Sequence, residues 1–226
     1  MNYRQKYFRR ARVAVSALRF VPFLRLAGLN GSLVSSMGHK DSDIDFLIIA
    51  KRNRLYTARF FSTVLIHLTG WRRRGKKIAG RICLNCFLAD DEPSIYPHQP
   101  ESAEKVAQSN RNLVVLIDEG GHEELFFATN KWMENYDIDG LWHAAEVKET
   151  LAKNGPRRPK KSLEWLLSGR LGNILERKLM GFQKKRILGG VKEGDETVAE
   201  DNEIRLHPKK VAYCHPEHSE GSQPGR

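Results

Sequence analysis

The sequence predicts an α/β fold, and three segments carry this prediction. Residues 43–50 pass from polar side chains into an unbroken apolar run, which is typical of a central strand. Residues 54–70 have the pattern of an amphipathic helix that ends at Gly70, and residues 81–88 form a second strand candidate. Because strand, helix and strand follow one another at this spacing, we expect α/β organisation.

The N-terminal segment is expected to lead into this unit. Residues 3–18 are rich in helix formers, and Pro22 stops the predicted helix. Residues 23–29 read as a short, mostly buried strand. The triplet at 30–32 ends that strand, and residues 35–40 form a polar loop or a single helical turn.

The second half of the chain is mostly helical in pattern, which divides the protein into three parts. We expect an α/β core at 1–95, a helical partner region at 96–190, and an arm with a disordered tail at 191–226. The individual expectations are helices at 101–112, 122–135, 142–153 and 161–187, a link or strand at 113–117, a basic loop at 154–161, an acidic stretch at 193–203, and a last strand or arm at 204–211.

Composition excludes several classes of protein. The 226 residues are 40% hydrophobic, enough for a sizeable core, so a fibrous or wholly disordered chain is excluded. No apolar run approaches the roughly 18 residues of a membrane-spanning helix. Three cysteines exclude a disulfide scaffold and favour the reducing cytoplasm. The net charge of +11 predicts attraction to polyanions such as nucleic acids and nucleotides.

The clearest chemical signal is a pair of acids at the start of the central strand. Residues two apart on a strand point to the same face, so Asp43 and Asp45 present two carboxylates side by side. Such a pair repels unless a cation joins it, and Mg²⁺ prefers carboxylate and phosphate oxygens. Two Mg²⁺ ions held there would activate an attacking hydroxyl and neutralise a leaving pyrophosphate. We therefore predict a magnesium site for a nucleoside triphosphate (NTP).

Residues before the acids are expected to hold the nucleotide. Gly31 permits close backbone approach, and Ser32 can hydrogen-bond a triphosphate oxygen. Lys40 and Ser42 are further nucleotide-binding candidates. The alternative is an ordinary surface loop that Asp41 and Ser42 cap, with both acids merely solvated at the start of a strand.

Residues 28–49 resemble the signature of the nucleotidyltransferase superfamily that includes DNA polymerase β. The match is closest to its small bacterial members, which carry Gly-Ser and, after a gap, Asp-x-Asp on a strand; here these are Gly31-Ser32 and Asp43-Ile44-Asp45. The resemblance implies a nucleotidyltransferase-type mixed sheet flanked by helices, followed by a mostly helical region. It also implies transfer of a nucleoside monophosphate from an NTP such as ATP to an acceptor hydroxyl, with release of pyrophosphate.

One departure from the family pattern concerns a third carboxylate on the next strand. Asn85 stands at the corresponding position, where it can offer Mg²⁺ a neutral oxygen but cannot act as a general base. Cys83 and Phe87 are expected to share the face of Asn85, and neither replaces a carboxylate. Asp90 or Asp91 would serve only if the strand register differs from the one predicted.

Three weaker sequence patterns also have purely structural interpretations. Cys83 and Cys86 have metal-ligand spacing, but three residues apart on a strand they face opposite sides and are expected to be core cysteines. The basic runs 72–77, 156–161 and 184–186 contact nucleic acid or are simply solvated. Equally open is whether cations at the end of the acid-bearing strand lie near the nucleotide or on plain surface; these are Lys51, Arg52 and Arg54.

The sequence leaves the acceptor open between a small molecule, an RNA end and a protein side chain. Three rival functions also remain. The first is a nucleotide-binding module without turnover, which Asn85 motivates. The second is an antitoxin-type domain that pairs with a helical toxin. The third is a basic RNA-binding protein, whose binding would survive loss of both Asp43 and Asp45.

Overall fold

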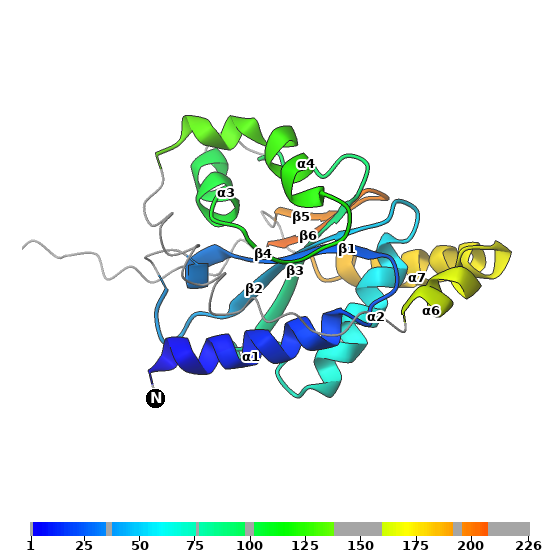
Figure 1. Cartoon of the computed structure of the whole chain (residues 1–226), viewed down its shortest axis with the longest axis horizontal. Helices are drawn as coiled ribbons and strands as arrows, with labels where there is room; N and C mark the ends of the chain where they lie inside the picture. Colours follow the sequence, from blue (N-terminus) through cyan, green and yellow to red (C-terminus); the bar gives the residue numbers. More distant parts are fainter. Residues whose placement is uncertain are drawn as a thin grey trace, which may run out of the picture.

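A six-stranded mixed sheet forms the centre of the protein (Figure 1). The computed structural model describes residues 2–34, 38–75, 77–97, 102–137, 160–191 and 196–207. The strand order is β4-β1-β2-β3-β6-β5; only the β2–β3 pair is parallel among these neighbours. The expected α/β class is confirmed. The strands are β1 (Leu24–Asn30), β2 (Ile44–Ala50), β3 (Ile82–Ala89), β4 (Val114–Asp118), β5 (Glu196–Ala199) and β6 (Glu203–His207).

Helices cover both faces of the sheet. In Figure 1, α1 and α2 lie on one face, α3 and α4 lie on the other, and α6 and α7 lie at one end. The α-helices are α1 (Tyr3–Leu18), α2 (Leu55–Leu68), α3 (Ala103–Asn110), α4 (His122–Thr129), α6 (Lys160–Leu167) and α7 (Arg170–Leu188), and the 3₁₀ helices are η1 (Gly31–Val34) and η3 (Lys131–Asn135). Within these described segments, no helix is both long and apolar enough to cross a membrane.

The side chains of β2 are buried on both faces of the sheet, which explains why its sequence is apolar without alternation. Phe46 and Ile48 pack in the core between the sheet and α1–α2, whereas Leu47 and Ile49 pack in the core under α3–α4. All residues of β2 are buried, since it lies between β1 and β3 with helices on both faces. The acids at its start are therefore held by a rigid central strand.

The sheet takes strands from all three parts into which the sequence was divided. β4 comes from the region 96–190 and pairs with β1, and β6 comes from the region 191–226 and pairs with β3. The expected helix at 142–153 and the tail from 208 onward lie outside the described residues.

The helix predicted over 161–187 is divided at Gly169, a glycine that favours a bend, so the chain turns there and α6 and α7 are separate helices. Arg54 is buried against this turn: its Nε donates to the Leu167 carbonyl, and its Nη2 donates to the Ser168 carbonyl, each at 3.2 Å. Carbonyls at a helix end need such donors. Arg54 thus stabilises the α6–α7 turn rather than lying with the acids.

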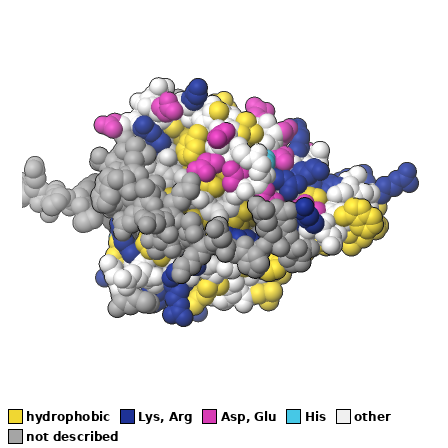
Figure 2. Space-filling model, in the orientation of Figure 1, with side chains coloured by type: hydrophobic (Ala, Val, Ile, Leu, Met, Phe, Trp, Pro, Cys, Tyr) yellow, Lys and Arg dark blue, Asp and Glu magenta, His cyan; other side chains and the backbone are white. Residues whose placement is uncertain are grey.

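The α6–α7 end also exposes apolar side chains that a core helix would bury. Trp165 on α6 is 81% exposed. Hydrophobic and cationic side chains lie side by side on this end of the molecule (Figure 2).

Candidate metal and nucleotide site

The two acids of the motif lie together with a cysteine from the neighbouring strand. Asp45 on β2 is paired in register with Cys83 on β3 and with Asn30 on β1, so the three side chains form a row on one face of the sheet. Asp43 lies just before β2. One ligand atom from each of Asp43, Asp45 and Cys83 lies within 4.8 Å of the others.

Burial makes the charge on Asp45 costly. Its side chain is buried, and this burial raises its pKa well above 3.8; the negative charge of Asp43 raises the pKa further. Two adjacent carboxylates, one of them buried, are the electrostatic signature of a site that a cation stabilises.

Arg73 supplies the one cation that contacts this pair among the described residues. Its Nη1 lies 2.6 Å from Asp43 Oδ2 and 3.7 Å from Cys83 Sγ. Its backbone N–H donates to the Ile82 carbonyl at 2.8 Å, which fixes the segment before β3 beside the acids. The sequence placed Arg73 in a basic run and missed this contact, because nothing local links residue 73 to residue 43.

Asn85 reaches Asp45 through a bulge in β3. The β2–β3 register pairs Leu84 and Cys86 with consecutive residues of β2, so Asn85 is the extra residue between them. Asn85 Nδ2 donates to Asp45 Oδ1 at 2.9 Å. Its Oδ1 is buried and has no hydrogen-bond partner in the described part of the chain. Asn85 thus orients Asp45 and keeps one unused oxygen.

The same bulge overturns two expectations about strand faces. Phe87 packs in the α1–α2 core, so it does not share the face of Asn85. Cys86 packs in the α3–α4 core, on the same side of the sheet as Cys83, since the extra residue reverses the alternation. Burial raises the pKa of Cys86 to about 12, as for an inert core thiol. Cys83, in contrast, lies at the acid pair and is not a core cysteine.

Asp90 and Asp91 do not supply a third carboxylate. Asp90 Oδ1 accepts from the backbone N–H of Arg52 at 2.8 Å, and Asp91 forms an ion pair with the Arg52 side chain. The Asp90 N–H donates to the Ala50 carbonyl, so both acids lie at the opposite end of β2 from Asp45. Arg52 contacts Asp90 and Asp91 at this end, and Lys51 is exposed there, so both cations lie away from Asp45.

Gly31 allows the backbone after β1 to pass directly beside Asp45. Its φ is +71°, a left-handed conformation that glycine adopts readily. A Cβ at this position would lie 2.8 Å from Asp45 Oδ2, closer than van der Waals contact allows. Both the backbone conformation and the position of Asp45 therefore require glycine here.

Gly31→Ala is expected to weaken Mg–nucleotide binding and to lower the melting temperature. The left-handed φ costs about 1–2 kcal/mol for a residue with a Cβ, and the new methyl pushes the Asp45 carboxylate aside. Gly121→Ala is the matched control, because Gly121 has a φ of +80° but no atom within 4 Å of its Cβ position. Calorimetric Mg–ATP titrations should show the binding defect only in Gly31→Ala; equal nucleotide affinity in the two variants would contradict this role.

The other predicted nucleotide-binding residues are Ser32, Ser42 and Lys40, which differ in burial and in their hydrogen bonds. Ser32 is buried on η1 next to Gly31. Ser42 is buried, and its hydroxyl accepts from the His39 N–H at 3.2 Å, so it caps a turn as the alternative interpretation anticipated. Lys40 is exposed and its carbonyl accepts from the Tyr7 hydroxyl of α1. No local sequence pattern predicts this contact between α1 and the loop, because the two residues are 33 positions apart.

The donor atoms fit a hard divalent cation. Asp43 and Asp45 offer carboxylate oxygens, and the unused Asn85 Oδ1 adds an amide oxygen beside them. Burial and the charge of Asp45 hold the pKa of the Cys83 thiol well above 9, so sulfur does not compete as a thiolate. An oxygen set of this kind suits Mg²⁺ or Mn²⁺ better than a thiophilic metal.

Comparisons with protein-family models, with curated proteins and with solved structures gave no match for this chain. The geometry around Asp43 and Asp45 is the main structural feature that indicates a function. That geometry combines two adjacent acids, a position (Gly31) at which any side chain would clash with Asp45, and a neighbouring arginine.

Proposed function

We propose that the protein is a nucleotidyltransferase that transfers a nucleoside monophosphate from a Mg–NTP to an acceptor hydroxyl. The observation that carries the proposal is the pair of adjacent carboxylates: Asp45 lies on the central strand β2 next to Gly31, and Asp43 lies just before that strand. A buried carboxylate beside a second carboxylate lowers the stability of the fold unless a cation binds between them. This cost supports a functional role for the pair. The resemblance of residues 28–49 to the superfamily signature points to the same reaction.

In this function each residue has a separate role. Asp43 and Asp45 hold Mg²⁺, and the Asn85 amide keeps the Asp45 carboxylate in place through the 2.9 Å hydrogen bond. Backbone and hydroxyl groups at Gly31 and Ser32 bind triphosphate oxygens. When bound, Mg²⁺ supplies charge neutralisation on the phosphates and activation of the acceptor hydroxyl.

The acceptor oxygen forms a bond to the α-phosphorus while the bond between the α-phosphorus and the bridging oxygen breaks. Pyrophosphate leaves, and the acceptor proton goes to water, because the Asn85 amide cannot accept it. We expect catalysis to depend strongly on the metal and to be slower than in enzymes with a carboxylate base, which typically contributes about 10²–10⁴-fold.

Asn85 also favours a second candidate function, a module that binds Mg–NTP without turnover. The same amide that orients Asp45 removes the general base from this position. This candidate predicts nucleotide binding equal to that of the enzyme and no pyrophosphate release with any acceptor.

Calorimetric titration with each of the common Mg–NTPs tests the shared part of both candidates. Wild type should bind only when Mg²⁺ is present, and Asp43→Asn should lose this binding. Asp41→Asn is the matched control, because Asp41 is an exposed acid two positions earlier and its substitution removes the same charge. Nucleotide binding that is equal in Asp43→Asn and wild type would contradict the proposed function.

A further inference from the structure

Two adjoining hollows beside the acid pair are lined by cations. The first, of about 400 Å³, is lined by His67, Gly70, Arg72, Arg74, Lys77 and Arg81. The second, of about 300 Å³, shares Arg72 and continues past Arg59 and Arg73 to Cys83. We call the surface formed by the cations that line the two hollows the arginine basin; these are Arg59, Arg72, Arg73, Arg74, Lys77 and Arg81. Since Arg73 and Cys83 line the second hollow and also lie at the acid pair, this hollow reaches the edge of the candidate site.

The basin has little negative charge to balance it. Only Arg73 forms an ion pair with a carboxylate among its described members, and no acidic side chain lines either hollow. Arg59 Nε is buried without a hydrogen-bond partner in the described structure. Burial and the nearby charge of Arg72 lower the pKa of Arg59 to about 10, and burial followed by the charge of Arg74 lowers that of Arg72. An anionic ligand would relieve both penalties.

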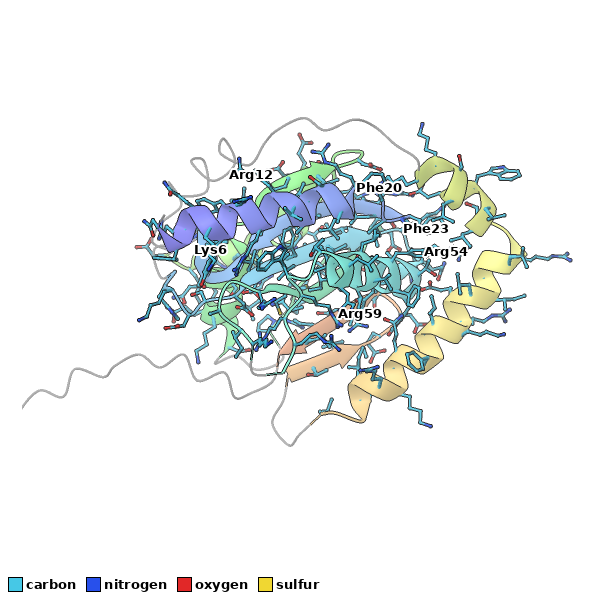
Figure 3. All side chains as sticks on the ribbon, turned by 90° about the horizontal axis from the view of Figure 1, so that it is seen from below. Lys6, Arg12, Phe20, Phe23, Arg54 and Arg59 are labelled. Atoms are coloured by element: carbon cyan, nitrogen blue, oxygen red, sulfur yellow. The ribbon has the colours of Figure 1, made fainter. Side chains whose placement is uncertain are left out.

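The basin lies on the opposite side of the acids from the predicted triphosphate contacts. Gly31 and Ser32 follow β1, on one side of β2, whereas the basin is built on the segment before β3 and reaches Leu206 of β6. Figure 3 shows Arg59 on α2, facing the β5–β6 strands. A nucleotide on Gly31 and Ser32 would therefore leave the basin free for a second phosphate-bearing molecule.

We infer that the arginine basin binds the phosphodiester backbone of a single-stranded nucleic acid, which is then the acceptor of the proposed reaction. A lone phosphate would occupy only part of one hollow, whereas a chain of phosphates can span two cationic hollows joined at Arg72. The path ends at Cys83 beside Asp43 and Asp45, which places the end of the strand at the acids. The acceptor role rests on the proposed function; the binding of phosphates does not.

Binding of a labelled single-stranded RNA, measured by anisotropy in EDTA without nucleotide, tests the basin alone. The double variant Arg72→Gln, Arg74→Gln removes two basin cations whose side chains make no hydrogen bond to the described residues. We expect weaker binding and a slope of log Kd against log salt about 1.4 smaller, since each phosphate contact on a single strand contributes about 0.7. The control Lys6→Gln, Arg12→Gln removes the same charge from the exposed face of α1 (Figure 3) and should keep the wild-type slope.

An unchanged salt slope in the basin variant, or an equal loss in the α1 control, would overturn the inference. Competition separates a phosphodiester site from a triphosphate site. Excess Mg–ATP should leave RNA bound to the wild type, and the basin variant should keep its Mg–ATP affinity. Displacement of RNA by Mg–ATP, with loss of Mg–ATP binding in the basin variant, would overturn the inference. RNA binding that depends on the basin, in a protein that binds no Mg–NTP, would support the phosphate site and refute the proposed function.

Discussion

Asp45→Asn is expected to abolish Mg²⁺-dependent nucleotide binding while raising the melting temperature of the metal-free protein. The substitution preserves shape and the hydrogen bond from Asn85, because the new amide oxygen can still accept it. It removes a buried charge that stands next to Asp43. A residue that reduces stability but is needed for binding is typical of a functional site.

The sign of the pH dependence follows from the raised pKa of Asp45. The folded state binds a proton at this carboxyl more tightly than the unfolded state, whose pKa is near 3.8. Stability from the protonated form is complete below that value and is lost as pH rises through the higher folded-state pKa. The melting temperature of Asp45→Asn in EDTA should therefore exceed that of wild type by a margin that grows as the pH rises above about 4.

Thermal unfolding at a series of pH values, with EDTA or with Mg²⁺ and ATP, measures both effects. Mg–ATP should raise the melting temperature of wild type and of Asp41→Asn but not that of Asp45→Asn. We expect the Mg–ATP affinity of Asp45→Asn to fall by about 100-fold or more, because loss of even the outer hydrogen-bond partners of metal ligands costs about 10–100-fold. A variant that melts below wild type at every pH, or that keeps its Mg–ATP response, would refute this role for Asp45.

Glu176→Ala is expected to destabilise the fold strongly through the start of α2. Glu176 on α7 is buried, and its carboxylate accepts from the Tyr56 N–H at 2.9 Å and from the Thr57 N–H at 2.8 Å. It also accepts from the Thr57 hydroxyl at 2.5 Å. The side chain of Arg54, at the N-cap position of α2, makes no capping hydrogen bond. Glu176 thus replaces the missing local cap and places a negative charge at the helix N-terminus.

The alanine variant leaves these buried donors unpaired. Each of the three unsatisfied donors costs about 1–3 kcal/mol, and at the lower figure the total is about 3 kcal/mol. For a chain of this size, that loss corresponds to a melting temperature lower by about 6–12 °C. Glu176→Gln, which keeps one acceptor oxygen, should lose less, and Arg177→Ala on the exposed side of α7 should melt close to wild type. A melting temperature of Glu176→Ala equal to that of wild type would show that α2 does not need this cap.

Local patterns predicted the parts of the protein whose causes are local. The unbroken apolar run after Asp45 could be recognised because β2 is buried on both faces. The two-residue spacing of Asp43 and Asp45 predicted that their carboxylates lie close together. Pro22 predicted that the first helix ends before it, and α1 ends at Leu18.

Features that depend on distant residues were missed. The bulge at Asn85 is visible only in the pairing of β2 with β3, so the expected faces of Phe87 and Cys86 were wrong. The contact by which Arg54 stabilises the turn between α6 and α7 joins residues more than a hundred positions apart in the chain. Arg73 likewise meets Asp43 only after α2 has reversed the direction of the chain.

Transfer of label from an NTP labelled at the α-phosphate is the most direct test of the proposed activity. Wild type and Asp41→Asn would be incubated with each labelled Mg–NTP and with single-stranded RNA, and free pyrophosphate and RNA-bound label would be counted together. The nucleotidyltransferase function, with the acceptor inferred from the basin, predicts equal amounts of both products and their loss in Asp43→Asn. Nucleotide binding without pyrophosphate release or label transfer from any NTP would contradict the enzyme and leave the silent binding module.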